Sequence, residues 1–523
     1  MARKTGNCPA CGGDVEFRSL TSLVTVCPYC HSVVARNDRQ LSDQGKIAEI
    51  VDSQSPLQLG VRGVWLGKSF RLIGRVQYQH SAGGVWDEWY ASFSDQKWGW
   101  LSEAQGRFGM MLARPVKSPD EVHAIESLTA GQTLTLENKF RLQVNEVGNA
   151  VVAAAEGELP FNPIMQSQHR FVDLEGQRGE LATIEYSGPQ PLVFLGQAAT
   201  LTELGLMDAA LKQEATKAVG ALQLNCPKCA GPLELVQPDA AQRVTCPSCR
   251  SLLDVEGKRL EYLSTLKPPR PALKIPLGTK GTLRGVEYQV LGYMRRSVTY
   301  DHDYFWQEYL LYSPRHGYTW LVESDDHWSC GRSIPSGSLQ NSARGVLYEG
   351  NSYRLFQRAK ATVRQVWGEF YWKVAINEQV FLSDYIRPPH ALSVETTTDP
   401  GEDGRNPASE INATLSEYLT HAEIEKAFQL PHLPRGWGVA PNQPNPVTAG
   451  VYLQWMLFLV AVGAIHMLWP VITTHQVDFG FTLATMAMLS AIPIGSMVYS
   501  WSFEVRRWQD SDFSPYSTGS GEE

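Results

Sequence analysis

Two pairs of cysteine hooks decide how this chain is organised: Cys8-Pro9-Ala10-Cys11 with Cys27-Pro28-Tyr29-Cys30, and later Cys226-Pro227-Lys228-Cys229 with Cys246-Pro247-Ser248-Cys249. The two hooks are separated by 15 residues in the first pair and by 16 in the second. CPxC hooks at this spacing are typical of four-cysteine zinc sites. We therefore predict two rubredoxin-like zinc ribbons, each with one structural zinc ion. The alternative, free or redox-active cysteines, is disfavoured by the regular spacing.

The chemistry of these hooks points to a structural site. Four thiolates close the shell of a zinc ion, whereas catalytic zinc keeps one position for water. Thiolates held for a metal need a reducing compartment, and no secretory signal peptide precedes Cys8, so we expect the N-terminal part to be cytosolic. The predicted metal ligands are Cys8, Cys11, Cys27, Cys30, Cys226, Cys229, Cys246 and Cys249. The ninth cysteine, Cys330, has no assigned role, and His31 is expected to be an ordinary surface histidine.

Length and charge limit the function further. The chain has 523 residues, enough for several domains, and a formal net charge of -8. A general nucleic-acid-binding protein shows a basic surface, which this composition does not provide. The basic residues around the hooks are also few and scattered. We therefore expect no nucleic-acid partner.

The segments after each ribbon are predicted to be two copies of one β-rich domain. Short alternating runs between glycine and polar turns favour a sandwich or barrel over a βαβ fold. An internal repeat at this scale indicates duplication. The matched segments are Leu59-Gly60 with Leu277-Gly278, Trp86–Tyr90 with Trp306–Leu310, Trp98–Glu103 with Tyr318–Glu323, and Gly157-Glu158 with Gly368-Glu369. The predicted units are ribbons at 1–36 and 223–256 and β-domains at 57–222 and 272–387.

Helices are predicted between and after these units. The polar connector Arg39–Val51 and the segment Leu201–Leu222 have helical patterns. Residues 388–448 are rich in proline and are predicted to be a linker. One helix, Ile411–Gln429, is expected within that linker, because Leu415, Leu419, Ile424 and Phe428 form an apolar stripe.

Two transmembrane helices are predicted at 449–503. Val451–Val471 and Phe481–Ser500 contain no Asp, Glu, Lys or Arg and have the length needed to cross a bilayer. A buried core hairpin is the alternative. Arg506 and Arg507 follow the second span and the connecting loop has no Lys or Arg, so both termini are expected in the cytoplasm, with 504–523 as a tail. His466 lies in the first span, where packing against the sister helix is favoured over a functional role.

Glutamates and aromatic residues are the remaining candidates for function. Phosphate-loop, dinucleotide-binding, nucleophile-elbow and HExxH motifs are absent from the sequence. The catalytic candidates are Glu88, Glu103, Glu308 and Glu323. Glu88 and Glu103 are 15 residues apart, as are Glu308 and Glu323, and one hypothesis is that each pair acts as acid and base, as in glycoside hydrolysis. Structural pairing of these carboxylates is the favoured alternative. The aromatic clusters, which form either core or a recognition groove, are Trp86, Trp89, Tyr90, Trp98 and Trp100, and Tyr304, Phe305, Trp306, Tyr318 and Trp320.

These features together resemble a bacterial family called domain of unknown function 4178. The CPxC hooks, the Leu-Gly-x-x-Gly motif, the Trp-x-Glu-aromatic strand and the Trp-Leu-x-Glu strand carry the resemblance. The stretches 418–428 and 441–446 and the closing Glu504–Trp508 are similar to longer members. The resemblance implies a bacterial inner-membrane protein, often encoded beside polyamine-synthesis-like enzymes and membrane-stress proteins. The family provides no catalytic residues to carry over.

Two functions remain open. The first is a membrane-tethered cytosolic scaffold or adaptor that binds a partner protein or peptide at the inner membrane. The resemblance suggests a membrane-stress or polyamine-linked system as its context. The second is an enzyme acting on a membrane-proximal or cationic substrate with the paired glutamates, which the acidic net charge would suit. The closed metal sites and the lack of a catalytic motif favour the scaffold.

Overall fold

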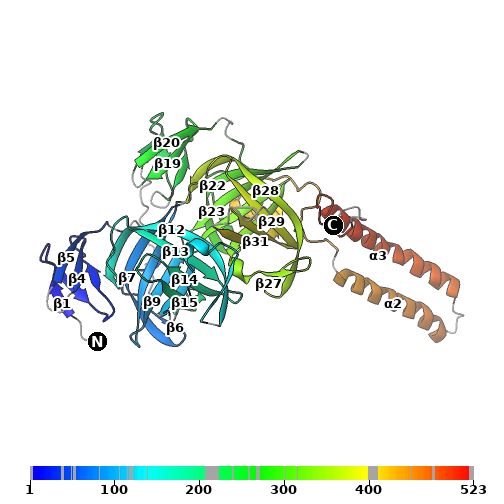
Figure 1. The fold of residues 1–523 in the computed structure, drawn as a ribbon. Helices are drawn as coiled ribbons and strands as arrows, with labels where there is room; N and C mark the ends of the chain where they lie inside the picture. Colours follow the sequence, from blue (N-terminus) through cyan, green and yellow to red (C-terminus); the bar gives the residue numbers. More distant parts are fainter. Residues whose placement is uncertain are drawn as a thin grey trace.

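The computed structural model describes residues 4–516, apart from 37–40, 49, 51–54, 82, 105, 115, 117–121, 138, 207–222, 238–240, 257–258, 267–270, 301, 315, 398–409, 448 and 474–477. The fold is mainly β. Two ribbons, two large β-units and a helical hairpin follow one another along the chain, and the hairpin projects away from the second β-unit (Figure 1).

The first ribbon consists of short antiparallel strands. They are β1 (Lys4–Asn7), β2 (Asp14–Phe17), β3 (Val24–Val26), β4 (Ser32–Arg36) and β5 (Leu41–Lys46). β1 pairs with β2, and β3, β4 and β5 pair in that order. The helix predicted over Arg39–Val51 is wrong at Leu41–Lys46, because pairing with β4 holds these residues extended. The rest of that segment lies partly outside the described residues.

The first β-unit is a closed barrel, here called barrel 1. In spatial order its wall consists of β7 (Lys68–His80), β8 (Val85–Phe93), β9 (Trp98–Ala104), β10 (Arg107–Arg114), β15 (Leu192–Ala198), β14 (Glu180–Glu185), β13 (Gln168–Glu175) and β12 (Phe140–Leu159). β12 also pairs with β7, which closes the eight-stranded antiparallel sheet. Short strands β6 (Arg62–Trp65) and β11 (Thr133–Leu136) pair with β7 and β12.

The second ribbon and the second β-unit, barrel 2, repeat this plan. The ribbon contains β16 (Gln223–Asn225), β17 (Pro232–Glu234), β18 (Arg243–Thr245), β19 (Ser251–Glu256) and β20 (Arg259–Thr265). The wall of barrel 2 consists of β22 (Val286–Thr299), β23 (Asp303–Ser313), β24 (Gly317–Ser324), β25 (His327–Ile334), β31 (Ile411–Leu419), β30 (His390–Thr396), β29 (Gln379–Arg387) and β28 (Asn351–Phe370), and β28 pairs back onto β22. The additional short strands are β21 (Lys280–Leu283), β26 (Gln340–Ser342) and β27 (Gly345–Tyr348).

The segment predicted as a linker completes barrel 2. The prediction of a linker at 388–448 is wrong for β30 and β31, which pair with each other and close the wall against β29 and β25. The helix predicted from Ile411 begins only at His421: α1 (His421–Phe428) follows a capping box formed by Thr420 and Glu423. The helix predicted over Leu201–Leu222 is not seen at Leu201–Gly205, which form turns, and 207–222 lie outside the described residues.

Side chains alternate along each strand between the barrel interior and the outer face. Trp86 of β8 and Phe171 of β13 have ring centroids 5.6 Å apart, although β7 and β12 separate their strands in the wall. Such a contact is possible only across the interior. Trp86, Glu88 and Tyr90 therefore face the lumen, by which we mean the interior space of a barrel, and Asp87 and Trp89 face outward.

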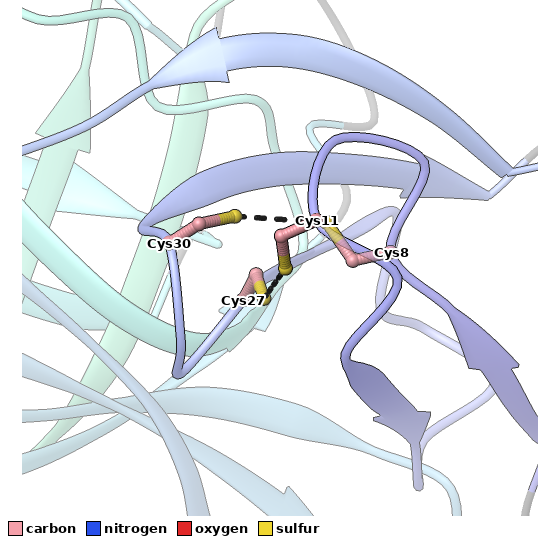
Figure 2. A group of neighbouring side chains, drawn as sticks. All are labelled: Cys8, Cys11, Cys27 and Cys30. Atoms are coloured by element: carbon pink, nitrogen blue, oxygen red, sulfur yellow. Dashed lines mark hydrogen bonds between the residues drawn. The ribbon is translucent and has the colours of Figure 1, made fainter.

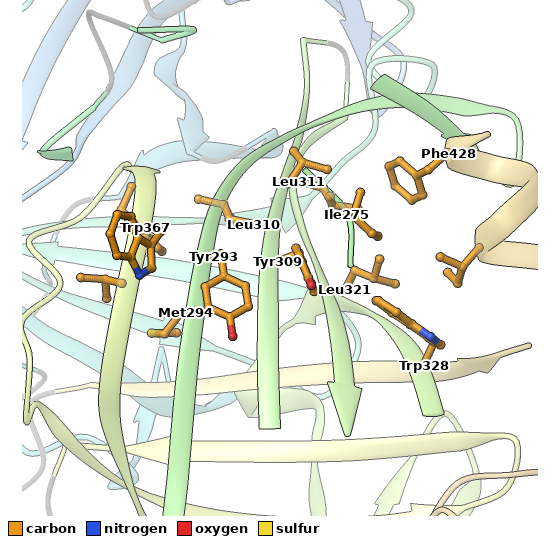
Figure 3. Packing of buried hydrophobic residues seen from close by; sticks show 14 of the residues in the cluster. Ile275, Tyr293, Met294, Tyr309, Leu310, Leu311, Leu321, Trp328, Trp367 and Phe428 are labelled. Atoms are coloured by element: carbon orange, nitrogen blue, oxygen red, sulfur yellow. The ribbon is translucent and has the colours of Figure 1, made fainter. Parts of the chain in front are cut away.

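The outer faces are buried beneath segments that precede each barrel and beneath α1. In barrel 2 the cluster contains Ile275 from the lead-in segment 273–279, Tyr309 and Leu321 from the wall, and Phe428 from α1 (Figure 3). In barrel 1 the corresponding cluster contains Leu57, Trp89, Leu101 and Leu204. The outer face of each wall thus serves mainly for packing, and further polar side chains are found in the lumen.

Each ribbon is joined to its barrel through the sheet. β3 pairs with the end of β12, with Thr25 opposite Glu158, and β18 pairs with the end of β28, with Val244 opposite Glu369. A ribbon therefore extends one wall strand of its barrel. The repeat seen in the sequence is a repeat of this whole ribbon–barrel unit.

The two barrels contact each other closely. A Cβ atom at Gly106 would lie 2.7 Å from the Cα atom of Gly317, so the backbones of the two barrels are in direct contact here. Ser336 donates a hydrogen bond to Asn145, and Glu146 forms a β-bridge with Glu410. Contacts between such distant parts of the sequence fix one barrel against the other.

The C-terminal hairpin consists of α2 (Ala449–Ile472) and α3 (Phe479–Arg507). Both helices are long and apolar enough to cross a membrane, with mean hydropathies of 2.0 and 1.6 in their most apolar windows, and neither window is buried. The end of α3 returns to barrel 2. There Arg507 donates hydrogen bonds to the carbonyls of Ala440 and Pro441, and Trp508 packs against Phe356.

Candidate functional site

The cysteine hooks form two compact four-sulfur groups. The Sγ atoms of each group lie within 4.8 Å of one another. In the first group Cys8 and Cys30 are 3.7 Å apart, as are Cys11 and Cys27 (Figure 2). A tetrahedron with metal–sulfur bonds of about 2.3 Å has sulfur–sulfur distances of about 3.8 Å. Both groups can therefore hold a metal ion, and the predicted ligand sets are the ones that come together.

Backbone turns shape each group for negatively charged sulfur. Gly13 N–H donates to Cys11 Sγ at 3.4 Å, and Gly231 N–H donates to Cys229 Sγ at 3.4 Å. The turn residue Gly12 has φ +77, which a residue without a Cβ adopts readily. The closed four-sulfur arrangement leaves no ligand position on the protein side for catalysis. His31, on the following turn, is not a member of either group.

A repeated glutamate locks each ribbon onto its barrel, and sequence reasoning missed this role. Glu158 accepts hydrogen bonds from the N–H groups of Arg18 and Ser19 and from the hydroxyl of Ser22. Glu369 accepts from the N–H groups of Val236 and Gln237. The signal was the matched Gly157-Glu158 and Gly368-Glu369 pair, whose partners lie 132 to 140 residues away in the sequence.

Two of the four candidate catalytic glutamates lie on the outer face. Glu103 accepts hydrogen bonds from Ser55 Oγ at 2.6 Å and from Trp89 Nε1 at 2.8 Å. Glu323 is paired with Lys274 Nζ at 2.8 Å and is 1% exposed. Ser55 and Lys274 precede the two barrels at corresponding places. Glu103 and Glu323 therefore hold the lead-in segments against the wall, and burial raises the pKa of Glu103 to about 7.

The other two candidates face the lumens, so the structure does not bring the predicted pairs together. Glu88 is opposite Ser102, and Glu103 is opposite Asp87, which places Glu88 and Glu103 on opposite faces of the sheet. Glu308 is opposite Val322, and Glu323 is opposite Gln307, with the same result. An acid–base pair acting on one substrate needs both carboxylates on one face.

The lumen of barrel 1 contains buried carboxyl groups that have few hydrogen-bond donors around them and, among the described residues, no Lys or Arg ion pair at Glu88 or Asp173. Glu88 Oε1 accepts a hydrogen bond from Trp86 Nε1 at 3.2 Å, and Glu88 Oε2 is buried with no hydrogen-bond partner among the described residues. Burial raises the pKa of Glu88 to about 8, and the charge of Asp173 adds to the effect. Burial also raises the pKa of Asp173 to about 7, although the Thr183 hydroxyl donates to it at 2.6 Å.

Two histidines sit beside other acids of this lumen. His80 Nε2 lies 2.7 Å from Glu146 Oε1, and His169 Nδ1 lies 3.3 Å from Glu185 Oε1. Burial works against protonation of His80, but the hydrogen bond and charge of Glu146 raise its pKa overall. Tyr78 stacks on His169 with ring centroids 4.4 Å apart. The lumen is therefore polar and aromatic rather than packed with aliphatic side chains at this end.

The lumen of barrel 2 holds a complete ion-pair network. Arg296 Nη1 lies 2.6 Å from Glu395 Oε1 and 3.3 Å from Glu308 Oε1. Trp306 Nε1 donates to Glu308 Oε1 at 2.6 Å, and the Arg296 guanidinium lies over the Trp306 ring. Burial opposes the charge on Arg296, but Glu395 and Glu308 raise its pKa. Gln357 Nε2 donates to Asp384 Oδ2 at 2.6 Å.

Both lumens open into one continuous cavity of about 3360 Å³. Its lining includes Glu88 and Asp173 of barrel 1, Arg296 and Glu395 of barrel 2, and Tyr304, which shares the inward face of β23 with Trp306. The predicted aromatic clusters are divided by strand alternation. Trp86, Trp306 and Trp320 line the cavity, whereas Trp89 is buried core.

The remaining single candidates lie apart from this cavity. Cys330 is on β25, where its sulfur lies 3.9 Å from the Thr319 hydroxyl, and burial raises its pKa. His466 stacks on Phe481 of the neighbouring helix with ring centroids 5.5 Å apart. Neither residue belongs to a candidate metal-binding group among the described residues.

The family assignment follows from the two barrels. The family model described as domain of unknown function (DUF4178) matches residues 58–200 and 276–419. These ranges end with β15 and with β31, so each match covers one barrel. The chain belongs to the DUF4178 family.

The second DUF4178 match confirms that the repeat reaches Leu419, beyond the limit of 387 predicted for the second β-domain. No curated protein matches the chain. The solved structure of a protein with unknown function from the DUF3598 family of Nostoc punctiforme is similar over 71% of this chain and 100% of its own, at 10% identity and a TM-score of 0.12.

Proposed function

We propose that this DUF4178 protein is a membrane-anchored binding protein that holds a segment of a partner protein or peptide in the cavity shared by its two barrels. The two apolar helices anchor it in the inner membrane, and the barrels work as a scaffold or adaptor at the cytosolic surface. The continuous cavity is the observation that carries the proposal.

The size and lining of the cavity support a partner segment. Pockets for small molecules and cofactors are about 300–1,000 Å³, and this cavity is several times larger. Aromatic side chains such as Trp86 and Trp306 stand among carboxylates along it, a mixture that is typical of recognition surfaces. Contacts between the barrels hold the two halves of the cavity in one arrangement.

Zinc is the metal that we propose for both ribbons. Four cysteine thiolates in a tetrahedral arrangement suit Zn²⁺, and a site that closes a small domain contributes directly to its folding. Such ions are structural: they stabilise each ribbon, and Glu158 and Glu369 then fix the ribbon to the barrel wall. The ribbons therefore support the binding unit rather than the bound partner.

An orientation with both termini in the cytoplasm is supported by charge. Arg506 and Arg507 end α3, and positively charged residues at helix ends favour the cytoplasmic side. The contacts of Arg507 and Trp508 keep that end of α3 next to barrel 2. The barrels and their thiolates would then lie in the reducing compartment.

The alternative proposal, an enzyme that uses paired glutamates on a cationic substrate, has less support. Glu103 and Glu323 are occupied in holding the lead-in segments. Glu308 is bound to Arg296. Of the four predicted glutamates, only Glu88 faces the cavity without a cation among the described residues, so neither predicted pair provides both the acid and the base that the alternative requires.

Site-specific photocrosslinking tests the binding function. A photoreactive phenylalanine analogue in place of Tyr304, which lines the cavity and is 39% exposed, is expected to capture a discrete partner in native membranes. The matched control replaces Tyr262, which is 47% exposed on the second ribbon, and is expected to capture none. Deletion of 447–523 should abolish capture if the anchor brings protein and partner together. Equal labelling from both positions would contradict a cavity-bound partner.

A further inference from the structure

The two lumens present equivalent acids at equivalent positions of the wall. Glu88 lies opposite Val76 on the neighbouring strand, and Glu308 lies opposite Met294. Asp173 lies opposite Thr183, and Asp384 lies opposite Ser393. Glu185 follows Thr183 by two residues on β14, and Glu395 follows Ser393 by two residues on β30. Each barrel therefore directs a set of one Asp and two Glu side chains inward.

Barrel 2 fills this acidic set with its own cation. The guanidinium of Arg296 reaches across the lumen to Glu395 on β30, from which its strand is separated by β28 and β29. The same group contacts Glu308 and lies over Trp306. Arg296 is 6% exposed, so its guanidinium is an internal ligand rather than a surface group.

Barrel 1 lacks that cation. Tyr78 lies opposite Trp86, as Arg296 lies opposite Trp306, so a tyrosine stands where barrel 2 has the arginine. The Tyr78 ring stacks between Trp86 and His169. Arg107, at the rim, is bound to Glu175 and Ser333. Among the described residues no Lys or Arg forms an ion pair with Glu88 or Asp173.

The missing partner is visible at the atomic level. Glu88 Oε2 is a buried oxygen that forms no hydrogen bond of good geometry among the described residues, and the hydroxyl of Ser102, opposite Glu88 on β9, offsets the burial of this carboxylate only in part. Buried carboxylates are normally paired or hydrogen-bonded, and an orphaned one is costly to maintain. Trp86 Nε1 holds the other oxygen, as Trp306 does for Glu308, so the carboxylate is positioned and its free oxygen borders the cavity.

We propose that the lumen of barrel 1 binds the guanidinium group of a ligand, in the way that the lumen of barrel 2 binds the guanidinium of Arg296. Glu88 and Asp173 accept its N–H groups, and Trp86 supplies the aromatic wall. Guanidinium is planar and presents several donors at once, which suits two carboxylates on different strands better than a spherical ammonium does. This proposal rests on the binding function proposed above and assigns the chemistry of one subsite.

An arginine side chain of a bound peptide and a free alkylguanidinium share this chemistry. Isothermal titration of the full chain in detergent can distinguish them with three probes: butylguanidinium, a blocked Gly-Arg-Gly peptide, and the same peptide with neutral citrulline in place of arginine. We expect both cationic probes to bind and the citrulline peptide not to bind. Tighter binding of the arginine peptide would assign the site to a protein segment, and tighter binding of butylguanidinium to a small molecule. Binding of the citrulline peptide equal to that of the arginine peptide would overturn the proposal.

Two variants locate the site. Glu88→Gln keeps the shape of the side chain and should weaken binding at least about tenfold, because a buried charge partner is removed. Tyr78→Arg places the cation of barrel 2 into barrel 1 and should abolish binding. Arg296→Ala should gain a second site for butylguanidinium in barrel 2, which also shows that the probe can enter a lumen of this kind. Unchanged affinity in both barrel 1 variants would overturn the proposal.

Proton release gives a readout that simple unfolding would not mimic. A guanidinium beside Glu88 stabilises its carboxylate, so a protonated Glu88 must lose its proton when the ligand binds. The binding enthalpy at pH 7 should therefore depend on the ionisation enthalpy of the buffer. This dependence should nearly vanish at pH 9 and should decrease in Glu88→Gln, in which Asp173, with a pKa raised to about 7, still loses a proton. The other titratable groups facing this lumen are Tyr78, His80, Glu146, His169, Asp173, Glu175 and Glu185. Equal proton release in wild type and Glu88→Gln would contradict the assignment to Glu88.

Failure of this inference and failure of the binding function give different results. If the guanidinium probes do not bind but crosslinks from position 304 still capture a partner, the subsite is wrong and the binding protein stands. If the probes bind and no partner is captured, the site takes a small molecule and the scaffold function is wrong.

Discussion

One carboxylate in each repeat connects a metal-binding ribbon to a barrel. Glu158 is 2% exposed and compensates two backbone N–H groups of the ribbon that have no strand partner in the barrel. Gly157, which precedes it, has φ +72, and a Cβ there would lie 2.4 Å from the carbonyl oxygen of Ile73. The Gly-Glu pair therefore needs both of its residues: the glycine for the close approach and the glutamate for the ribbon.

Replacement of Glu158 by alanine should loosen the first ribbon. Each buried donor left without an acceptor costs about 1–3 kcal/mol, so the loss of the acceptor for two N–H groups should cost the ribbon about 2–6 kcal/mol of stability. Hydrogen exchange at the amides of Arg18 and Ser19 is the measurement, since these two donate to the carboxylate. Glu287→Ala, at an exposed wall position, is the control and should leave their protection unchanged. Unaltered protection in Glu158→Ala would show that the carboxylate is dispensable.

The raised pKa of Glu88 should make stability fall as the pH rises. The folded chain keeps this proton until about pH 8, whereas the unfolded chain loses it near the ordinary value of 4.5. Between these values the folded state binds more protons, so the free energy of unfolding decreases with pH by at most about 1.4 kcal/mol per unit for this group. Asp173, with a pKa raised to about 7, contributes in the same direction.

Glu88→Gln removes the contribution of Glu88 while leaving that of Asp173. Chemical denaturation between pH 5 and pH 8 should therefore show the variant gaining on the wild type as the pH increases. Glu287→Gln serves as the exposed control, whose curve should run parallel to that of the wild type. Parallel curves for Glu88→Gln as well would mean that Glu88 titrates normally.

The sequence alone predicted the metal-binding groups, whose ligands are close together along the chain. It did not predict which face of the sheet each glutamate occupies, because that depends on strand register. All eight hook cysteines come together in two groups because each ribbon is a short, self-contained unit. The separation of 15 between Glu88 and Glu103 suggested a pair. Strand register sets Glu103 opposite Asp87, one residue from Glu88, and a shift of one residue reverses the face of the sheet. The lack of a cation beside Glu88 likewise depends on which residue stands at position 78 on the neighbouring strand.

The ribbons are the elements whose stability depends on a metal. Metal analysis of the full chain should give two zinc ions per molecule, and Cys226→Ser should reduce the count to one, because three thiolates bind zinc more weakly than four. Cys330→Ser is the matched control, since Cys330 lies on β25 away from both groups and the count should remain two. Two zinc ions in Cys226→Ser would show that this cysteine is not a ligand.

Local pattern and tertiary pairing conflicted in β31. Leu415, Leu419, Ile424 and Phe428 have the spacing of a helical stripe, yet Ile411–Leu419 is a strand and only His421–Phe428 is a helix. Pairing of β31 with β25 and β30 on both sides outweighs a weak helical preference. Barrel closure itself was not predictable, because it depends on contacts between β7 and β12 that are about 75 residues apart in the sequence.

For the molecule as a whole, the hairpin orientation can be tested with two reporter positions. A topology reporter fused after Glu523 should be active in the cytoplasm, because Arg506 and Arg507 favour that side for the end of α3. The same reporter inserted after Thr473, at the far end of α2, should report the opposite side of the membrane. A cytoplasmic signal from both positions would mean that the hairpin does not cross.

The closure of both barrels also restricts how any other protein can join this one. Every wall strand already has a hydrogen-bonded neighbour on each side, from β7 with β12 to β22 with β28. An incoming peptide therefore finds no unpaired main chain along the walls and cannot be bound there by strand addition. Selection among partners must then depend on contacts between the partner and the wall side chains that face the lumen of each barrel. Substitutions that change partner choice should accordingly fall at inward-facing positions, every second residue along a strand, and leave the intervening positions neutral.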